Sequence, residues 1–403
     1  MNSVGIDVSK GRSTVAILRP FGEIVRKSYD VRHTAEALKE LADTLKAIDG
    51  ETRIVMEATG RYYEPIAQVL HDNSLFVCVV NPLLIHGYSN NSLRKVKTDK
   101  ADAIKIAKYG LDNWTELRRY TSVDTVRQKL KVFSRQFNLY TKTKTALKNN
   151  LIAFLDQTFP SANSLFDSPV RSDGHQKWID FATSFWHVDC VRALSEKAFV
   201  ERYRKWCKRF GYQFSPSKAA DIHKLAFGKV ATMPKNANTK LLITGAANQL
   251  TETSKTVEIF RAEMILLASQ LPEYPIVLEM YGVGKTLASQ LIAEIGDVTR
   301  FTHRKSLIGF AGIDSPPNES GDYKGQGSEI TKRGSSPLRK TLFQVMNCLV
   351  QNSPFDEPVF QFMCKKRAEG KPYYVYMTAG ANKFLRIYYA KVMEHLRRLE
   401  DCS

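Results

Sequence analysis

Four carboxylate residues stand where a fold could gather them. Asp7 ends an apolar stretch ("VGID"), Glu57 ends another ("RIVME"), and Asp99 and Asp102 open a helical stretch ("TDKADAIKIAKYGLD"). Two acids three residues apart share one helix face, and strand ends of a sheet meet one face of the helix that follows. Clustered carboxylates repel and resist ionisation without a cation. The set predicts a site for a pair of Mg²⁺ ions, or Mn²⁺, suited to phosphoryl transfer.

Each acid alone has a simpler explanation. Asp99 would serve as the N-cap of its helix, and Asp102 as a first-turn residue favoured by the helix dipole. The run "RKVK" precedes this helix. We expect its Arg94, Lys95 and Lys97 to contact nucleic acid beside the acids.

The charge balance points to a polyanionic partner. The 403 residues include 59 Lys and Arg against 41 Asp and Glu, a net charge of +18, which favours nucleic acid without separating DNA from RNA or a membrane surface. No apolar run has the length of a membrane span, and the N-terminus has no leader pattern. The six cysteines form no CxxC pair, so we expect no zinc site, reduced thiols and a cytoplasmic protein.

The elements that must position the acids follow from hydrophobic patterning. Residues 3–31 predict three short strands, followed by a helix, a strand, a helix and a buried strand closed by Pro82. This is the order of an α/β, ribonuclease-H-like domain. From residue 99 the chain is helical, with long helices expected at 118–150 and 238–271 and more helices at 335–399. Residues 159–235 fit no clear pattern.

The helix expected at 118–150 carries nine basic residues against one acid, Asp124. Such a face would bind phosphates. The expected contacts are Arg127, Lys129, Lys131, Arg135, Lys142, Lys144 and Lys148.

A Gly-Val-Gly turn before a helix, in "LEMYGVGKTLASQLIAEIG", is typical of a helix-hairpin-helix. Its Gly282, Gly284 and Lys285 would meet a phosphate at the helix N-terminus. An ordinary tight turn between two helices explains the pattern equally well.

These motifs resemble a known family. "GIDVSK", "MEATGRYYEPIA", "VVNP" and "KTDKADA" resemble the DEDD, RuvC-like domain of bacterial insertion-sequence transposases related to the Piv invertase. "YGVGKTLASQLIAEIGDVTRF", "SLIGFAGIDSPPNESG" and "ITKRGSSPLRKTLFQV" resemble the family's second domain. The likeness covers residues 1 to about 115 and 275 to 400. It implies a bacterial recombinase acting on donor and target DNA and guided by a structured bridge RNA.

The resemblance also implies a serine nucleophile in the loop "IDSPPNESGDYKGQG" that forms a covalent phosphoserine link to DNA. Its counterpart is Ser320, while Ser315 and Ser328 compete nearby. The acids and Ser320 lie far apart in the chain, so the resemblance implies composite sites between subunits of a dimer or tetramer. Lys332 and Arg333 follow the loop, and we expect them to contact nucleic acid.

We expect three domains: a RuvC-like domain at 1–115, a helical, coiled-coil region at 116–274 and a mostly α transposase domain at 275–403. Residues 150–275 hold a longer insertion than is typical of the family, whose members have mainly a coiled coil there. The insertion's "ERYRKWCKRFGYQF" would stack on unpaired RNA bases, or it would form a helical subdomain with Trp206 and Phe210 buried.

Three functions remain open on these residues. The first is a recombinase that uses Ser320. The second is a junction-resolving nuclease that uses the same acids with water as nucleophile. The third is a non-catalytic nucleic-acid scaffold, which the intact set of acids disfavours. Ser320 separates the first two, because only covalent chemistry requires it.

Overall fold

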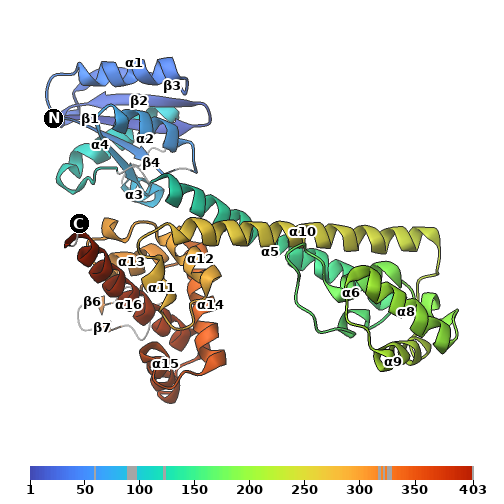
Figure 1. Ribbon diagram of the computed structural model, residues 1–403. Helices are drawn as coiled ribbons and strands as arrows, with labels where there is room; N and C mark the ends of the chain where they lie inside the picture. The colour runs from blue at the N-terminus through green and yellow to red at the C-terminus, as the bar shows by residue number, and fades with distance from the viewer. Residues whose placement is uncertain are drawn as a thin grey trace. The chain divides into compact units, whose positions relative to one another are not determined.

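The computed structural model in Figure 1 describes residues 1–58, 60–88, 98–120, 124–315, 319–320, 323–324 and 329–401. The chain forms two compact units, Met1–Val123 and Asp124–Ser403. No helix in the described ranges is long and apolar enough to cross a bilayer. The cysteines in those ranges are all free thiols.

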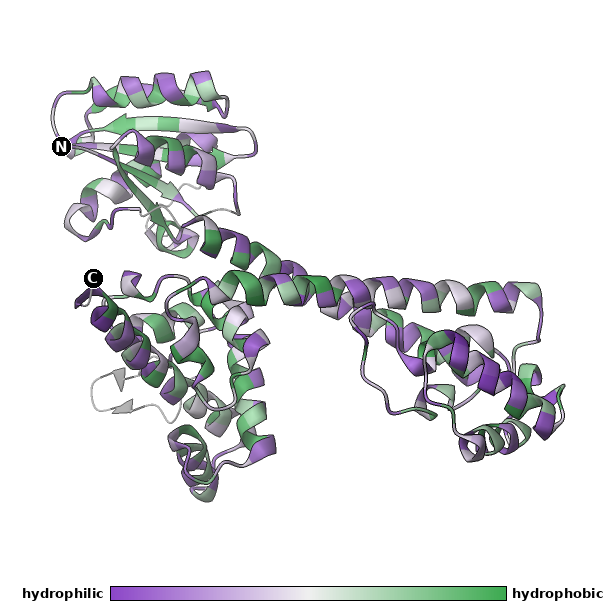
Figure 2. Ribbon diagram, viewed as in Figure 1, coloured by the Kyte–Doolittle hydropathy of each residue, from purple (hydrophilic) through white to green (hydrophobic). Residues whose placement is uncertain are grey.

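The first unit is built on a five-stranded sheet of order β3-β2-β1-β4-β5. Its strands are β1 (Asn2–Ser9), β2 (Arg12–Leu18), β3 (Ile24–Arg32), β4 (Thr52–Glu57) and β5 (Phe76–Val80). The first three form an antiparallel meander, while β1, β4 and β5 run parallel. This topology confirms the expected ribonuclease-H-like domain, and Figure 2 shows apolar residues along its strands.

Helices cover both faces of this sheet. They are α1 (Ala35–Lys46), α2 (Tyr63–Asp72), α3 (Pro82–Tyr88) and α4 (Asp99–Asp112). Helices α1 and α2 pack with Val4 and Ile6 on one face, and α3 and α4 pack with Val55 on the other. Alternate residues of a strand point to opposite faces, so β1 and β4 each contribute side chains to both layers.

Helix α4 lies unusually close to β1. A Cβ added at Gly5 would stand 2.1 Å from the Ala103 carbonyl oxygen, and one at Gly110 would stand 2.3 Å from the Ser3 hydroxyl. Because Gly5 meets the first half of the helix and Ser3 meets its end, α4 runs antiparallel to β1. Its N-terminus therefore lies toward the end of β1 that carries Asp7.

The cap of α4 differs from one expectation. The Thr98 hydroxyl accepts a hydrogen bond from the Ala101 amide, so Thr98 is the N-cap and Asp99 is the first residue inside the helix. Thr98 has the extended backbone that an N-cap requires. The Asp99 carboxylate is thus not used in capping.

The second unit is organised by two long helices, α5 (Thr125–Thr158) and α10 (Ala237–Ser269). Leu130 of α5 shares a core with Met264 of α10, whereas Leu155 shares another with Ile243, so the two helices are antiparallel. The Asp124 carboxylate accepts from the Arg127 amide and starts α5 there. The expectation that this helix begins at residue 118 was therefore wrong.

A helical subdomain lies between α5 and α10 in sequence. Its helices are α6 (Lys177–Ser184), α7 (Asp189–Arg192), α8 (Glu196–Phe210) and α9 (Pro216–Phe227). Phe181, Tyr203 and Trp206 are buried together in its core, and the Trp206 indole donates to the Ser184 hydroxyl at 3.0 Å. The buried-subdomain alternative is confirmed for Trp206, whose ring is not available to stack on bases.

The C-terminal part is also helical, as expected. Its elements are α11 (Tyr274–Leu278), α12 (Lys285–Ile295), α13 (Arg304–Ala311), β6 (Glu319–Ser320), β7 (Tyr323–Lys324), α14 (Ser336–Asn352), α15 (Pro358–Ala368) and α16 (Tyr373–Asp401). Its helices share one apolar core with the first part of α5 and the last part of α10. The loop around Ser320 contains a two-stranded ladder in which Ser320 pairs with Tyr323.

Candidate active site

The sheet register brings Asp7 and Glu57 to one place. The last parallel pair between β1 and β4 is Ile6 with Met56, so Asp7 and Glu57 are the next residues along two neighbouring strands. Ile6 and Met56 point into the layer of α1 and α2. By alternation, Asp7 and Glu57 point to the other face, where α4 packs.

Helix α4 supplies the other two acids. Asp99 and Asp102 lie in its first turn, at the end nearest Asp7. Burial and the charges of Asp102 and Asp99 raise the pKa of Asp7 from 3.8 to about 6. Burial and Asp7 also raise the pKa of Glu57, and Asp102 adds to that rise. The structure thus gathers the four acids named from sequence into one electrostatic neighbourhood.

Two basic residues partly offset the repulsion among the four carboxylates. Lys105, one turn further along α4, acts to lower the pKa of Glu57. The Arg12 guanidinium lies 3.6 Å from the Asp99 carboxylate and 3.8 Å from that of Asp30. Asp30 also accepts a 2.7 Å hydrogen bond from the Thr14 hydroxyl, and Thr14 is paired with Asp7 across the β1–β2 ladder.

The donor set suits a divalent cation. All four acids offer oxygen ligands, and the repulsion that raises the pKa values of Asp7 and Glu57 is what a cation would relieve. Within the described ranges, no group of three or more His, Cys, Asp or Glu side chains is positioned to hold a metal ion. The acids are neighbours without forming a closed ligand shell, and ligation by all four requires side-chain movement.

The loop that carries Ser320 belongs to the second unit. Its backbone is described at 319–320 and 323–324, and Ser328 lies outside the described residues. Ser315, at the start of the loop, is described and has an interaction partner.

The neck of this loop is closed by backbone hydrogen bonds. Lys332 donates to the Gly312 carbonyl at 3.1 Å, and Thr331 donates to that of Asp314 at 2.9 Å. A Cβ added at Gly334 would lie 2.2 Å from the Phe310 carbonyl oxygen. The two ends of the loop therefore approach each other in a way that only glycine permits at residue 334.

Two arginines expected to bind nucleic acid form ion pairs with buried glutamates of the same unit. The Arg127 guanidinium binds both carboxylate oxygens of buried Glu273 and is itself only 11% exposed. The Arg135 guanidinium lies 3.5 Å from the carboxylate of Glu294, which is 1% exposed. Removing Arg127 would leave the buried charge of Glu273 without its cationic partner. Arg127 is thus structural, which corrects its expected role, whereas Arg135 remains 46% exposed and its contact with nucleic acid stays a prediction.

The remaining basic positions of α5 vary in exposure. Lys129, Lys142 and Lys148 are exposed, whereas Lys131 and Lys144 are half-buried. Burial lowers the pKa of Lys144. The exposed lysines stay available to phosphates.

The other expected contacts lie on turns. Gly282 has a φ of +79° and its turn precedes α12, whose first residue, Lys285, is exposed, as is Gly284. Lys332 and Arg333 are exposed at the loop neck. Arg94, Lys95 and Lys97 lie outside the described residues.

Sequence reasoning missed Arg12 and Lys105. Arg12 follows the Lys10-Gly11 turn. Because β1 and β2 pair antiparallel, Arg12 lies beside Ser9, at the same end of β1 as Asp7. Gly5 inside a strand was a further signal, because glycine in a strand often marks a close backbone approach.

Two transposase families match the chain. Residues 4–160 match a DEDD transposase family, and residues 274–359 match the transposase IS116/IS110/IS902 family. Pilin gene-inverting proteins of Moraxella bovis and Moraxella lacunata are each 23% identical over 348 residues, which cover 85% of this chain and 80% of each relative.

Among solved structures, Thermus thermophilus RuvC is similar in two forms. The complex with a Holliday junction substrate is 10% identical, with a TM-score of 0.23, and the second structure is 13% identical, with a TM-score of 0.21. Each alignment covers 29% of this chain and 96% of the RuvC chain.

Proposed function

Because the chain belongs to the IS116/IS110/IS902 family of transposases, we propose that its DNA recombination proceeds through a covalent bond to Ser320, assisted by a divalent metal. Family membership makes the chain an enzyme of DNA transposition or recombination. The observation that carries the proposed chemistry is the gathering of Asp7, Glu57, Asp99 and Asp102, with the pKa of Asp7 raised to about 6.

These four acids would hold the metal, as Mg²⁺ or Mn²⁺. When bound, the cation supplies Lewis-acid polarisation of a phosphodiester and neutralises the charge of the acids. Asp99 must first exchange its contact with Arg12. Lys105 partly offsets the charge beside Glu57.

Ser320 would then carry out a transesterification. Its Oγ forms a bond to phosphorus while the bond from phosphorus to one deoxyribose oxygen breaks. The serine loses a proton and the departing oxygen gains one, so protons balance. One phosphate ester replaces another, so the broken strand can be rejoined to a different end without an external energy source.

We propose further that the site is composite. The acids lie in the unit Met1–Val123 and Ser320 lies in the unit Asp124–Ser403. A dimer or tetramer would let one subunit's loop serve its neighbour's acids. The net charge of +18 and the exposed lysines of α5 favour binding to both DNA and a structured guide RNA.

The alternative is a junction-resolving nuclease that uses water. The ribonuclease-H-like topology and the carboxylate set serve it equally well. In that case Ser320 has no chemical role, and cleavage leaves no protein attached to DNA.

The test is a nicked suicide substrate incubated with the full chain and its RNA in Mg²⁺. We expect a protein–DNA adduct that mass spectrometry maps to Ser320. Ser320→Ala should bind DNA and RNA normally and cleave neither strand, whereas Ser315→Ala should retain the adduct. Cleavage by Ser320→Ala, together with no adduct in the wild type, would establish the water-dependent nuclease. An adduct on Ser328 would show that Ser328, and not Ser320, is the nucleophile.

The metal is tested separately. Asp102→Ala should abolish cleavage and weaken Mn²⁺ binding in calorimetry, with the thermal transition retained. Recombination by Asp102→Ala at the wild-type rate would show that Asp102 is not part of the metal site.

A further inference from the structure

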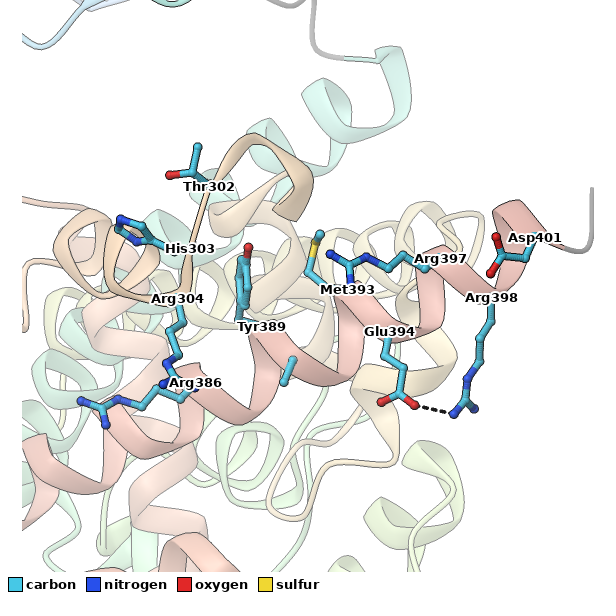
Figure 3. Close-up of a pocket in the computed structure, with 11 residues that line it drawn as sticks. Thr302, His303, Arg304, Arg386, Tyr389, Met393, Glu394, Arg397, Arg398 and Asp401 are labelled. Atoms are coloured by element: carbon cyan, nitrogen blue, oxygen red, sulfur yellow. Dashed lines mark hydrogen bonds and ion pairs between the residues drawn. The ribbon is translucent and has the colours of Figure 1, made fainter. Parts of the chain in front are cut away.

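A second basic site lies on the C-terminal helices, and its lining includes none of the residues assigned above. A pocket of about 530 Å³ opens between the segment that leads into α13 and the last turns of α16. Figure 3 shows side chains from both elements lining it. Four arginines line the pocket, against two acids, Glu394 and Asp401.

The pairing of these arginines is uneven. Arg398 forms an ion pair with Glu394. Arg304, Arg386 and Arg397 are exposed and make no ion pair with any residue that the structure describes. Figure 3 shows the Arg304 side chain extending from α13 toward α16, where Arg386 lies. Like charges brought to one pocket from separate elements repel, and a bound anion would remove that repulsion.

The helix dipole does not explain the set. Arginines in the last turn of a helix are favoured by the dipole, which accounts for Arg398. Arg386 lies about four turns before the end of α16, beyond the reach of that effect. Arg304 is at the opposite kind of helix end, in the first turn of α13, where the dipole disfavours a cation.

The spacing indicates an extended anion. Arg386, Ala390, Met393 and Arg397 follow one face of α16 at intervals of three or four residues. Arg386 and Arg397 are eleven residues apart, about 16 Å along the helix axis. A single phosphate cannot meet both guanidinium groups, whereas a nucleic-acid strand presents phosphates in series.

The floor between the arginines is apolar. It is formed by Tyr389, Ala390 and Met393. The Tyr389 hydroxyl donates to the Phe301 carbonyl at 3.0 Å, which ties the floor to the segment before α13. Such a floor suits the sugar face of a strand whose phosphates reach the arginines on either side.

We propose that this pocket binds the phosphodiester backbone of a nucleic-acid strand through Arg304, Arg386 and Arg397. The proposal rests on the recombinase function above, because it assigns to this surface a stretch of the same DNA or its RNA outside the reacting phosphate. Arginine suits this task because its planar fork binds phosphate oxygens in pairs.

The experiment compares two double variants of the full chain. Arg386→Gln/Arg397→Gln removes two pocket cations. Lys305→Gln/Lys391→Gln removes two exposed cations that adjoin pocket residues in sequence without lining the pocket. Affinity for duplex DNA and for single-stranded RNA is measured by fluorescence anisotropy at several salt concentrations in EDTA, where no cleavage occurs.

For the arginine variant we expect the slope of log affinity against log salt to fall by about 1.8 on a duplex or 1.4 on a single strand, with the lysine variant near wild type. Loss confined to DNA or to RNA would identify the strand. An unchanged slope, or equal losses in both variants, would overturn the proposal. Because binding is read without chemistry, neither result depends on Ser320 or on metal.

Discussion

Arg12 Nη2 lies 3.6 Å from the Asp99 carboxylate, within the neighbourhood where Asp99 is expected to bind a cation. Its side chain is 59% exposed and also approaches Asp30. A guanidinium and a divalent ion cannot both be the principal partner of one carboxylate. If Asp99 binds the metal as proposed, Arg12 would compete with the metal for that carboxylate.

Replacing Arg12 should tighten metal binding. The pair is exposed, so its contribution is about 0–1 kcal/mol, and Arg12→Gln should lower the Kd for Mn²⁺ by up to about fivefold. Calorimetry on the full chain measures this. Lys46→Gln removes the same charge from α1, on the opposite face of the sheet, and should change little. Weaker metal binding by Arg12→Gln would show instead that Arg12 helps to assemble the site.

The raised pKa of Asp7 predicts a pH-dependent stability of the metal-free protein. The folded state holds the Asp7 proton up to about pH 6, whereas the unfolded chain releases it near pH 4. The folded state thus binds more protons between these values, and stability falls as pH rises from about 4 to 6. Asp7 is only half-buried, so solvent screening limits the effect.

Asp7→Asn should therefore melt higher than wild type at pH 8 in EDTA, with the gain disappearing as pH falls toward 4. Added Mg²⁺ should reverse the order, because only the wild type keeps the full carboxylate set. Differential scanning fluorimetry across pH tests both statements, with Asp43→Asn on α1 as control. Equal melting temperatures at pH 8 would contradict the raised pKa.

The close contact at Gly5 predicts that a substitution there disrupts the metal site without changing any acidic residue. In Gly5→Ala the new Cβ would overlap backbone atoms of Ala103 and Ala107, so α4 must move and carry Asp99 and Asp102 away from Asp7. We expect destabilisation of about 1–3 kcal/mol and loss of Mn²⁺ binding. Gly87→Ala, with open space at its Cβ, is the matched control. Retained metal affinity in Gly5→Ala would mean that α4 does not set the site.

The four acids could be named from sequence because the relevant rules are local. Strand ends and the spacing of three residues on a helix each lie in a short window, and the order of the elements follows from joining such windows along the first 112 residues. The engagement of Arg127 and Arg135 could not be read in this way, since their partners Glu273 and Glu294 are 146 and 159 residues away. The basic residues expected on one helix were interpreted as a single binding face, but Arg118 and Arg119 precede α5, and packing buries part of the rest while leaving other lysines exposed.

The secondary structure of residues 159–235 could not be predicted from the sequence for a related reason. Its helices are short and its aromatics come from several of them, so no single window shows a helical period. Tyr203 and Trp206 become core residues only when α6 and α8 pack together. The alternation of basic and aromatic residues in α8 therefore reflects the two faces of one helix. The aromatic rings point into the core, and the charged side chains point to solvent.

The exposed lysines of α5 remain the predicted backbone contacts. Lys129→Gln/Lys142→Gln/Lys148→Gln should flatten the salt dependence of duplex binding by about 2.7 in slope, or 2.1 for a single strand. Lys27→Gln/Lys39→Gln/Lys46→Gln removes three exposed charges from the first unit and serves as the control. Equal slopes for the two variants would leave this face of α5 as solvated surface.

The neck of the Ser320 loop gives the last prediction. Gly334→Ala places a Cβ 2.2 Å from the Phe310 carbonyl oxygen and 2.5 Å from the Gly312 amide nitrogen. Because both are backbone atoms, the neck must open and the loop must change direction. A misplacement of about 1 Å costs on the order of 100-fold in rate for a positioned nucleophile, so adduct formation should fall by at least that factor.

Mn²⁺ affinity should be unchanged, since the acids belong to the other unit. Gly309→Ala, whose Cβ meets nothing within 4 Å, should retain the adduct. Full adduct formation by Gly334→Ala would mean that the neck does not aim the loop, whereas a parallel loss of metal affinity would mean that the change unfolds more than the neck.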